Sequence, residues 1–157
     1  MKKSIEILSK NYLQTEKVGE ILAEELLKEK ISRNSVVIGL IGNLGGGKTI
    51  LTKGLAKGLG VKSRITSPTF VLFKKMEIAD ANGYILKLRN FYHFDVYRIK
   101  SAKEILTLGF KKIISSAENI VIIEWANKIQ GLMPKNTIWI KFEFVDKNKR
   151  KISIRLH

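Results

Sequence analysis

The stretch GNLGGGKT, residues 42–49, stands between an apolar run, residues 35–42, and a run with helical spacing, residues 48–60. It fits the pattern G-x-x-x-x-G-K-[ST], in which Gly42 and Gly47 are the fixed glycines. A loop that wraps a polyphosphate turns its backbone N–H groups inward, through conformations that glycine tolerates better than other residues. The stretch therefore predicts a phosphate-binding loop between a strand and a helix. The plainer alternative is a glycine-rich turn.

The last two residues of the motif supply the chemistry that such a loop needs. The Lys48 side chain would reach the β- and γ-phosphates, and the Thr49 hydroxyl would take one coordination position on Mg²⁺. The helix that follows adds the positive end of its dipole beneath the phosphates. Nucleotide binding is therefore the working hypothesis.

The segments beside the motif predict a buried strand and a helix. The run SVVIGLIG, residues 35–42, is nearly all apolar, as expected of a strand buried on both faces of a parallel sheet. The helix after the loop is expected to end near Gly58 and Gly60. Its interior glycine, Gly54, would permit close packing on the sheet.

The rest of the chain predicts further strands and helices. The expected elements are a strand over residues 4–8, a helix from Thr15 to Lys30, a hairpin formed by 61–75 and 84–99 with turns at Pro68 and Asn82-Gly83, a capped helix over 101–114, a buried strand over 119–125 and a terminal hairpin within 137–156. Together they predict an α/β fold in one domain, residues 1–157. We expect a P-loop NTPase-like three-layer sandwich, whose central, mainly parallel sheet has antiparallel hairpins added at the edge.

The composition fits one compact domain and excludes several kinds of site. A chain of 157 residues with 45% hydrophobic residues can bury a proper core. Because it has no cysteine, disulfides, thiolate nucleophiles, iron–sulfur clusters and cysteine-based zinc sites are excluded. No stretch has the length of a signal peptide or a membrane span, so the expected location is cytoplasmic, without membrane contact.

The net charge of +15 permits contact with nucleic acid but does not select it. Only six of the 29 cationic residues are arginines, the usual choice for bidentate contacts with phosphates and bases. A lysine-rich, solvated surface explains the same composition, so both interpretations stay open.

Two acidic residues are candidates for the chemistry behind the loop. Glu124 ends the apolar run IVIIE, where a nucleoside triphosphatase places the carboxylate that holds Mg²⁺ or its waters; a solvent-facing acid is the alternative. Asp95 could orient a water molecule or complete the metal shell, or equally be a surface acid paired with Arg98. His93 is poorly supported as a transition-metal ligand, because the chain has one other histidine and no cysteine. Trp125 is either a core residue or a packing partner of an adenine ring.

Four stretches in order give the chain a resemblance to the bacterial TsaE (YjeE) family: GNLGGGKTILTKGLAKGLG, SPTFVLF, FYHFDVYRI and IVIIEWANK. The phosphate loop is generic, whereas the combination of SPTF, YHFDVYR and IEW is specific to this family. The resemblance implies an ATPase, using ATP and Mg²⁺, that binds the TsaD and TsaB subunits and resets their complex between rounds. That complex forms N6-threonylcarbamoyladenosine at position 37 of tRNAs that read codons starting with A. The ATPase would not transfer the threonylcarbamoyl group itself, and would meet tRNA through the complex.

The resemblance also implies roles for individual residues. Lys48, Asp95 and Glu124 would serve hydrolysis. Thr49 and Glu124 would hold Mg²⁺, and residues 66–70 would form a switch-like loop. The residues implied to bind the nucleotide are Thr15 and Trp125 near the adenine, and Asn43, Leu44, Gly45, Gly46, Gly47, Lys48, Thr49 and Ile50 in the loop.

Three features depart from the family's pattern. The family usually has Asp at position 43 and often Ala at position 46, where this chain has Asn43 and Gly46. Asn43 removes a negative charge beside the phosphates, and Gly46 would loosen the loop. The approach LKLRNF, residues 86–91, is somewhat longer than is typical, which leaves the hairpin register there open.

Two other classes of function share the phosphate-loop motif. A small P-loop kinase must also hold a phosphoryl acceptor and close an arginine-bearing lid, and this chain's six arginines are not clustered. A nucleotide-gated binding module would recognise tRNA or a protein partner and hydrolyse ATP slowly or not at all. Product analysis and turnover with partners distinguish the three.

Overall fold

A single mixed sheet forms the middle of the molecule. The computed structural model describes residues 3–29, 33–66, 72–79 and 88–156. Within these residues the sheet has seven strands in the order β1-β7-β6-β2-β5-β4-β3. The strands are β1 (Lys3–Ser9), β2 (Val36–Ile41), β3 (Phe73–Glu77), β4 (Asn90–Asp95), β5 (Asn119–Glu124), β6 (Ile138–Phe144) and β7 (Arg150–Leu156).

The centre of the sheet is parallel and its two edges are antiparallel. Strand β2 pairs in parallel with β5 and β6, and β4 pairs in parallel with β5. The pairs β3–β4, β6–β7 and β1–β7 are antiparallel. The two predicted hairpins are therefore confirmed as β3–β4 and β6–β7. In the first of them Glu77 pairs with Asn90, which sets the register that the sequence left open.

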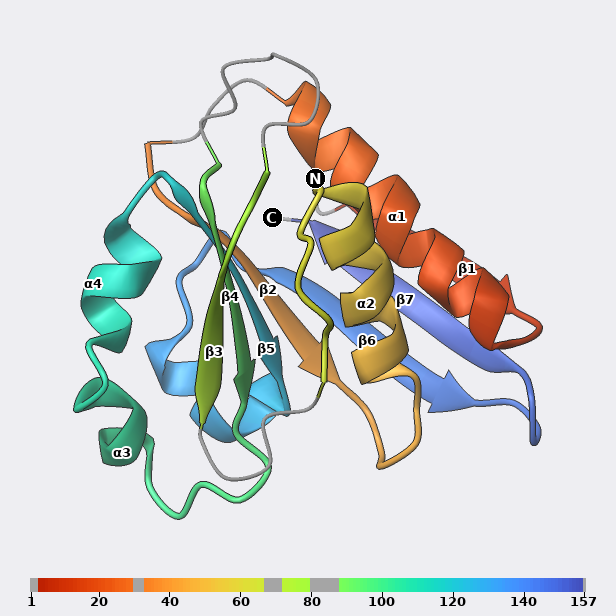
Figure 1. The fold of residues 1–157 in the computed structure, drawn as a ribbon. Helices are drawn as coiled ribbons and strands as arrows, with labels where there is room; N and C mark the ends of the chain where they lie inside the picture. Colours follow the sequence, from red (N-terminus) through yellow and green to blue (C-terminus); the bar gives the residue numbers. More distant parts are fainter. Residues whose placement is uncertain (1–2, 30–32, 67–71, 80–87, 157) are drawn as a thin grey trace.

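Helices cover both faces of the sheet and make three layers. Figure 1 shows α1 and α2 on one side of the sheet, with α3 and α4 on the other. The helices are α1 (Tyr12–Lys28), α2 (Lys48–Gly58), α3 (Ala102–Leu106), α4 (Phe110–Ser115) and the 3₁₀ helix η1 (Ala126–Leu132). Alternate residues of the strands face the two layers: Ile120 and Ile122 of β5 pack beneath α1 and α2, whereas Val121 and Ile123 pack beneath α3, α4 and η1. This alternation decides which strand residues can reach α2.

Helices α1 and α2 approach each other closely enough for their backbones to touch. A Cβ atom placed on Gly54 would lie 1.9 Å from the Glu16 carbonyl oxygen, and one on Gly19 would lie 2.2 Å from the Leu51 carbonyl oxygen. Gly54 was expected to allow packing on the sheet; this expectation is wrong about the partner, because the glycine faces α1. The position of α2 is thus fixed by contact between its backbone and that of α1.

Three predicted boundaries are also wrong. Helix α1 begins at Tyr12, before Thr15, because the Asn11 side chain caps it by accepting a hydrogen bond from the Gln14 N–H (2.9 Å). The region 101–114 has the predicted capping box at Ser101, but Gly109 at φ 77° divides it into α3 and α4. The strand expected over 84–99 is seen as β4, which ends at Asp95 before a turn in which the Ile99 N–H donates to the Val96 carbonyl.

Several expectations lie outside the described residues. They are the turns at Pro68 and Asn82-Gly83 and most of the switch-like segment 66–70. None of the helices in the described parts of the chain combines the length and apolar content that crossing a bilayer requires.

Candidate functional site

The glycine-rich loop connects the end of β2 to the start of α2, as predicted. Its tip, Asn43 to Gly45, is exposed, and the Gly46 N–H donates to the Asn43 carbonyl (3.0 Å). Gly47 has φ 104°, and a Cβ atom there would lie 3.3 Å from the Thr15 side chain. Only glycine adopts this backbone readily, so the turn into α2 depends on Gly47.

Lys48 is held inside this loop. Its side chain is almost fully buried, and its Nζ donates to the carbonyls of Gly42 (2.6 Å) and Asn43 (2.8 Å). Burial lowers the pKa of this ammonium below its ordinary value, and the negative charges of Glu124 and Asp95 offset part of the lowering. The Lys48 ammonium at the end of β2 has thus lost most of its contact with water.

Glu124 and Thr49 meet at the adjacent end of β5. The Thr49 hydroxyl donates to both carboxylate oxygens of Glu124, at 2.9 and 3.0 Å. Glu124 is 3% exposed, so the alternative of a solvent-facing acid is wrong. Residues 75 positions apart are brought together because β2 and β5 are parallel neighbours, so that the loop and Glu124 follow the same edge of the sheet.

His93 also contacts the Glu124 carboxylate, and the sequence analysis did not predict this contact. Its Nε2 lies 2.8 Å from Glu124 Oε1, and its side chain is fully buried. The other ring nitrogen, Nδ1, has no hydrogen-bond partner among the described residues. The available signal was the alternation of β4, which places His93 on the same face as Asp95; the diagonal contact with Glu124 follows from the β4–β5 register.

Asp95 and Trp125 lie beside the same group of residues. Asp95 ends β4 directly opposite Glu124 in the parallel register, and its Oδ1 accepts a hydrogen bond from the Tyr97 N–H (3.0 Å). Trp125 has a left-handed backbone at φ 61°. Its ring lies 4.1 Å from Lys48 Nζ and packs against the Tyr97 ring. Trp125 therefore contacts the motif lysine, and its contact with adenine stays a prediction.

The other predicted residues make none of the hydrogen bonds described above for Lys48, Thr49, His93 and Glu124. Thr15 is buried in α1, where its hydroxyl lies 2.7 Å from the Ser9 hydroxyl, and its methyl group lies beside Gly47 of the loop. Leu44 is 72% exposed, and Ile50 is half-buried. Of segment 66–70, the structure describes only Thr66, whose hydroxyl accepts from Lys74 Nζ (2.9 Å).

The two departures within the loop have distinct surroundings. Asn43 is exposed, and its backbone carbonyl accepts hydrogen bonds from the Gly46 N–H (3.0 Å) and from Lys48 Nζ (2.8 Å). Gly46 is buried, and a Cβ atom there would lie 2.9 Å from the Asn43 carbonyl oxygen. Glycine therefore allows a tighter turn than alanine would, and the prediction of a looser loop remains untested.

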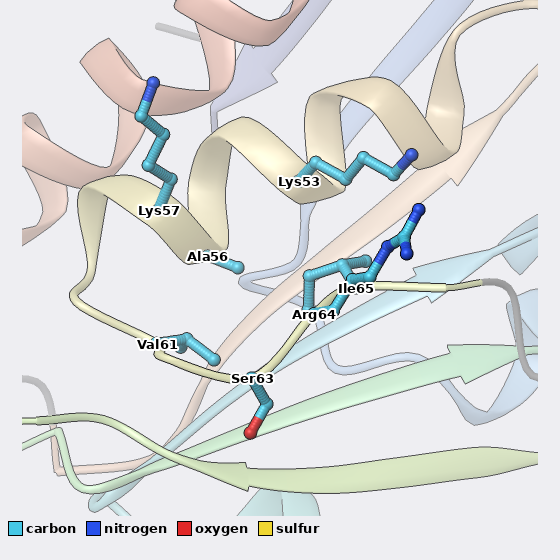
Figure 2. A pocket seen from close by; sticks show the side chains of 7 residues that line it. All are labelled: Lys53, Ala56, Lys57, Val61, Ser63, Arg64 and Ile65. Carbon is cyan, nitrogen blue, oxygen red and sulfur yellow. The ribbon is translucent and has the colours of Figure 1, made fainter.

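A pocket of about 260 Å³ lies apart from this site, between α2 and the segment that follows it. Figure 2 shows Lys53 and Arg64 extending in the same direction, while Lys57 extends toward α1, where its Nζ lies 2.9 Å from Glu20 Oε1. The lining residues are Lys53, Ala56, Lys57, Val61, Ser63, Arg64 and Ile65. None belongs to the predicted nucleotide site.

The donor set suits a hard cation better than a transition metal. Within the described residues there is no group of three His, Cys, Asp or Glu side chains that could hold a metal ion. Thr49 and Glu124 instead offer a hydroxyl and a carboxylate, which are the oxygen ligands that Mg²⁺ takes when phosphates and water complete its shell. The residues therefore fit Mg²⁺ bound together with a polyphosphate.

Comparison with known proteins shows the family of the chain. The family model described as "Threonylcarbamoyl adenosine biosynthesis protein TsaE" matches residues 9–152. The chain belongs to the TsaE family. The matched region contains the glycine-rich loop, His93, Asp95 and Glu124.

Individual TsaE relatives match over most of their length. The tRNA threonylcarbamoyladenosine biosynthesis protein TsaE of Haemophilus influenzae is 33% identical over 128 residues, which cover 82% of this chain and 75% of that protein. The protein of the same name from Rickettsia typhi is 36% identical over 146 residues, which cover 91% and 92%. The crystal structure of Bacillus subtilis YdiB has a TM-score of 0.66 at 26% identity, over 99% of this chain and 87% of that chain. The family places the chain in the biosynthesis of threonylcarbamoyladenosine on tRNA.

Proposed function

We propose that this TsaE member has a P-loop NTPase-like fold and hydrolyses ATP, with Mg²⁺, in support of a TsaD–TsaB complex. The observation that carries the proposal is the meeting of Lys48, Thr49 and Glu124 where β2 and β5 end. A glycine-rich loop, a buried ammonium and an acid bonded to a hydroxyl are the parts that phosphoryl transfer from ATP requires.

Each residue has a task in this proposal. The backbone N–H groups of the loop and the Lys48 ammonium bind the phosphates. Thr49 and Glu124 would hold Mg²⁺, which supplies positive charge against the charge that develops on the phosphates. Asp95, at the end of the strand beside Glu124, orients the attacking water and accepts its proton.

The proposed hydrolysis is slow in the isolated chain. Arg150 is the arginine that the described structure brings to the loop, where its guanidinium donates to the Gly45 carbonyl (3.3 Å). The same guanidinium also donates to three carbonyls of its own turn, so it acts as a brace. Because these contacts engage its guanidinium, Arg150 is not placed to stabilise charge in the transition state, and we expect turnover to depend on partner contact that repositions Asp95 and the switch-like segment.

The test is phosphate release from ATP by the purified chain, alone and with TsaD and TsaB. We expect free phosphate, a requirement for Mg²⁺ and a rate that rises when both partners are added. A phosphorylated product in place of free phosphate would indicate the kinase alternative. ATP binding without turnover under any of these conditions would indicate the nucleotide-gated module.

The biological setting is tested by purifying the chain with its partners from its own cells. We expect TsaD and TsaB to copurify, and any tRNA to be lost when those subunits are removed. tRNA that stays bound to the isolated chain would instead show direct contact by its basic surface.

A further inference from the structure

Glu124 is buried, and its carboxylate is held from two sides. Thr49 Oγ1 bonds to both oxygens of the carboxylate, and His93 Nε2 bonds to Oε1 alone. The His93 contact crosses from β4 to β5 diagonally, because the register places Ile122 opposite His93 and Asp95 opposite Glu124. Without His93, Thr49 alone of these two side chains would hold the carboxylate, and the group could rotate about its last side-chain bond.

The environment of the imidazole assigns its tautomer. A carboxylate oxygen accepts hydrogen bonds, so the ring nitrogen that faces Glu124, Nε2, carries the hydrogen. Nδ1 is buried and has no acceptor within the described residues, so a hydrogen there would be unsatisfied. The ring is therefore a neutral donor, which orients Glu124 without cancelling its negative charge. A lysine or arginine in this place would cancel that charge.

We propose that His93 is a positioning residue that holds the Glu124 carboxylate so that it accepts the Thr49 hydroxyl hydrogen. A hydroxyl that donates its hydrogen to Glu124 would coordinate Mg²⁺ through its oxygen, so the direction of this hydrogen bond suits Thr49 Oγ1 to the role proposed for it. This inference rests on the proposed function, and it extends that function to a residue on the neighbouring strand. Its experiments are chosen so that the two can fail separately.

Three variants separate positioning from packing. His93→Phe keeps a flat ring of similar size but removes the donor, whereas His93→Gln keeps an N–H donor at comparable reach. Phe91→Leu is the matched control, because Phe91 is fully buried on the same face of β4, two residues from His93. All three are measured for thermal stability, ATP affinity without Mg²⁺, and hydrolysis as a function of Mg²⁺ concentration.

We expect the Mg²⁺ dependence to respond to the donor. In His93→Phe the half-saturating Mg²⁺ concentration should rise roughly 10- to 100-fold, as is usual when a partner of a metal ligand is lost. ATP affinity without Mg²⁺ should stay within about twofold, because the phosphate donors are untouched. His93→Gln should recover most of the Mg²⁺ dependence, and Phe91→Leu should lower stability alone. An unchanged Mg²⁺ dependence in His93→Phe, or equal losses in the Phe and Gln variants, would overturn the proposal.

A second measurement needs neither nucleotide nor metal. Nitrogen NMR of the ring, in a protein whose other histidine is removed by His157→Gln, reports which nitrogen of His93 carries the hydrogen. We expect a protonated Nε2, an unprotonated Nδ1 and an N–H signal that is lost or shifted in Glu124→Ala. A hydrogen on Nδ1 would overturn the positioning role even if ATP is hydrolysed. Absence of hydrolysis in the wild-type chain, together with the expected tautomer, would refute the proposed function and leave the His93–Glu124 contact established.

Discussion

Helices α1 and α2 touch each other through their backbones, whereas α3 and α4, on the opposite face of the sheet, pack through side chains. Gly19 and Gly54 leave no room for a Cβ atom between the first pair. The second pair is covered by apolar side chains such as Ile105 and Phe110, and a Cβ atom on Gly109 would meet nothing within 4 Å. Side-chain packing adjusts to small changes, but backbone contact cannot.

The two faces of the sheet also differ in the side chains that the strands place on them. On β4 and β5 the residues that alternate toward α1 and α2 include His93 and Glu124, whereas those facing α3 and α4, such as Phe94 and Ile123, are apolar. Helix α2 begins with Lys48 and Thr49. The face of the sheet beneath α1 and α2 therefore carries the residues of the candidate site, whereas the face beneath α3 and α4 contributes apolar packing.

The largest effect is expected from removing the charge of Glu124. Glu124→Gln keeps the shape and one neutral oxygen but loses the negative charge that would offset Mg²⁺. Hydrolysis should fall by roughly 10² or more, since one well-placed electrostatic group in a dry site lowers the activation barrier by about 3–4 kcal/mol. ATP alone should still bind. Phosphate release and titration calorimetry measure the two quantities.

The matched control for Glu124 is its neighbour on the opposite face. Ile123→Val should leave hydrolysis unchanged and cost about 1 kcal/mol of stability. Thr49→Ala should show a milder form of the Glu124→Gln defect, and the double variant should be less than additive, because both act through one ion. If Glu124→Gln turns over normally while Asp95→Asn does not, the metal carboxylate is Asp95.

The next largest effect is a loss of stability when the contact between α1 and α2 is disturbed. Gly54→Ala places a methyl group against the Glu16 carbonyl, which no side-chain rotation relieves. We expect a loss of about 3 kcal/mol in unfolding free energy, or a melting temperature lower by roughly 6–12 °C. Gly109→Ala, which only strains the backbone at φ 77°, should cost about 1 kcal/mol. Equal losses in thermal unfolding would show that the two faces are equally adaptable.

A smaller effect is expected for Lys48. Lys48→Ala should weaken ATP binding at least tenfold, because each charge-assisted bond to phosphate contributes roughly 1.5–3 kcal/mol. Lys112→Ala, at an exposed position of α4, is the control and should leave the affinity unchanged. Titration calorimetry that finds the same ATP affinity in the Lys48 variant would remove the loop from the binding site.

The smallest effect is proton uptake on ATP binding. The pKa of Lys48 is lowered by burial, so above that pKa part of the folded population has lost the proton that the unfolded chain keeps. Stability should therefore rise with pH between this lowered pKa and the ordinary lysine value. ATP favours the ammonium, so binding at a pH between this lowered pKa and the ordinary lysine value should take up a fraction of a proton. Calorimetry in buffers of different ionisation enthalpy measures it, and Lys48→Arg should abolish it.

The sequence predicted those parts of the molecule that depend on local patterns. The strand–loop–helix unit around GNLGGGKT, the β6–β7 hairpin and the capping box at Ser101 follow from periodicity and short-range signals, and all are confirmed. The place of Glu124 also followed, because an acid at the end of an apolar strand is a local signal. Its contact with Thr49 needed only the expectation that β2 and β5 are parallel neighbours.

The parts that were missed depend on how distant segments pack. The partner of Gly54 is a carbonyl on α1, and no spacing within α2 distinguishes a helix neighbour from a sheet neighbour. His93 reaches Glu124 because β4 is in register with β5, which the sequence of β4 alone does not reveal. The break at Gly109 was hidden because the flanking residues keep a helical period on both sides.

The pairing of β1 with β7 has a consequence for how the chain assembles. Strand β2 is hydrogen-bonded to β5 and β6, and the loop that follows β2 is braced by Arg150, 105 residues beyond Gly45. Contacts between such distant segments form slowly, since a long loop must close before any of them stabilises the chain. On the ribosome, the glycine-rich segment therefore emerges well before the strands that will support it, and folding of the sheet is completed only after synthesis reaches β7.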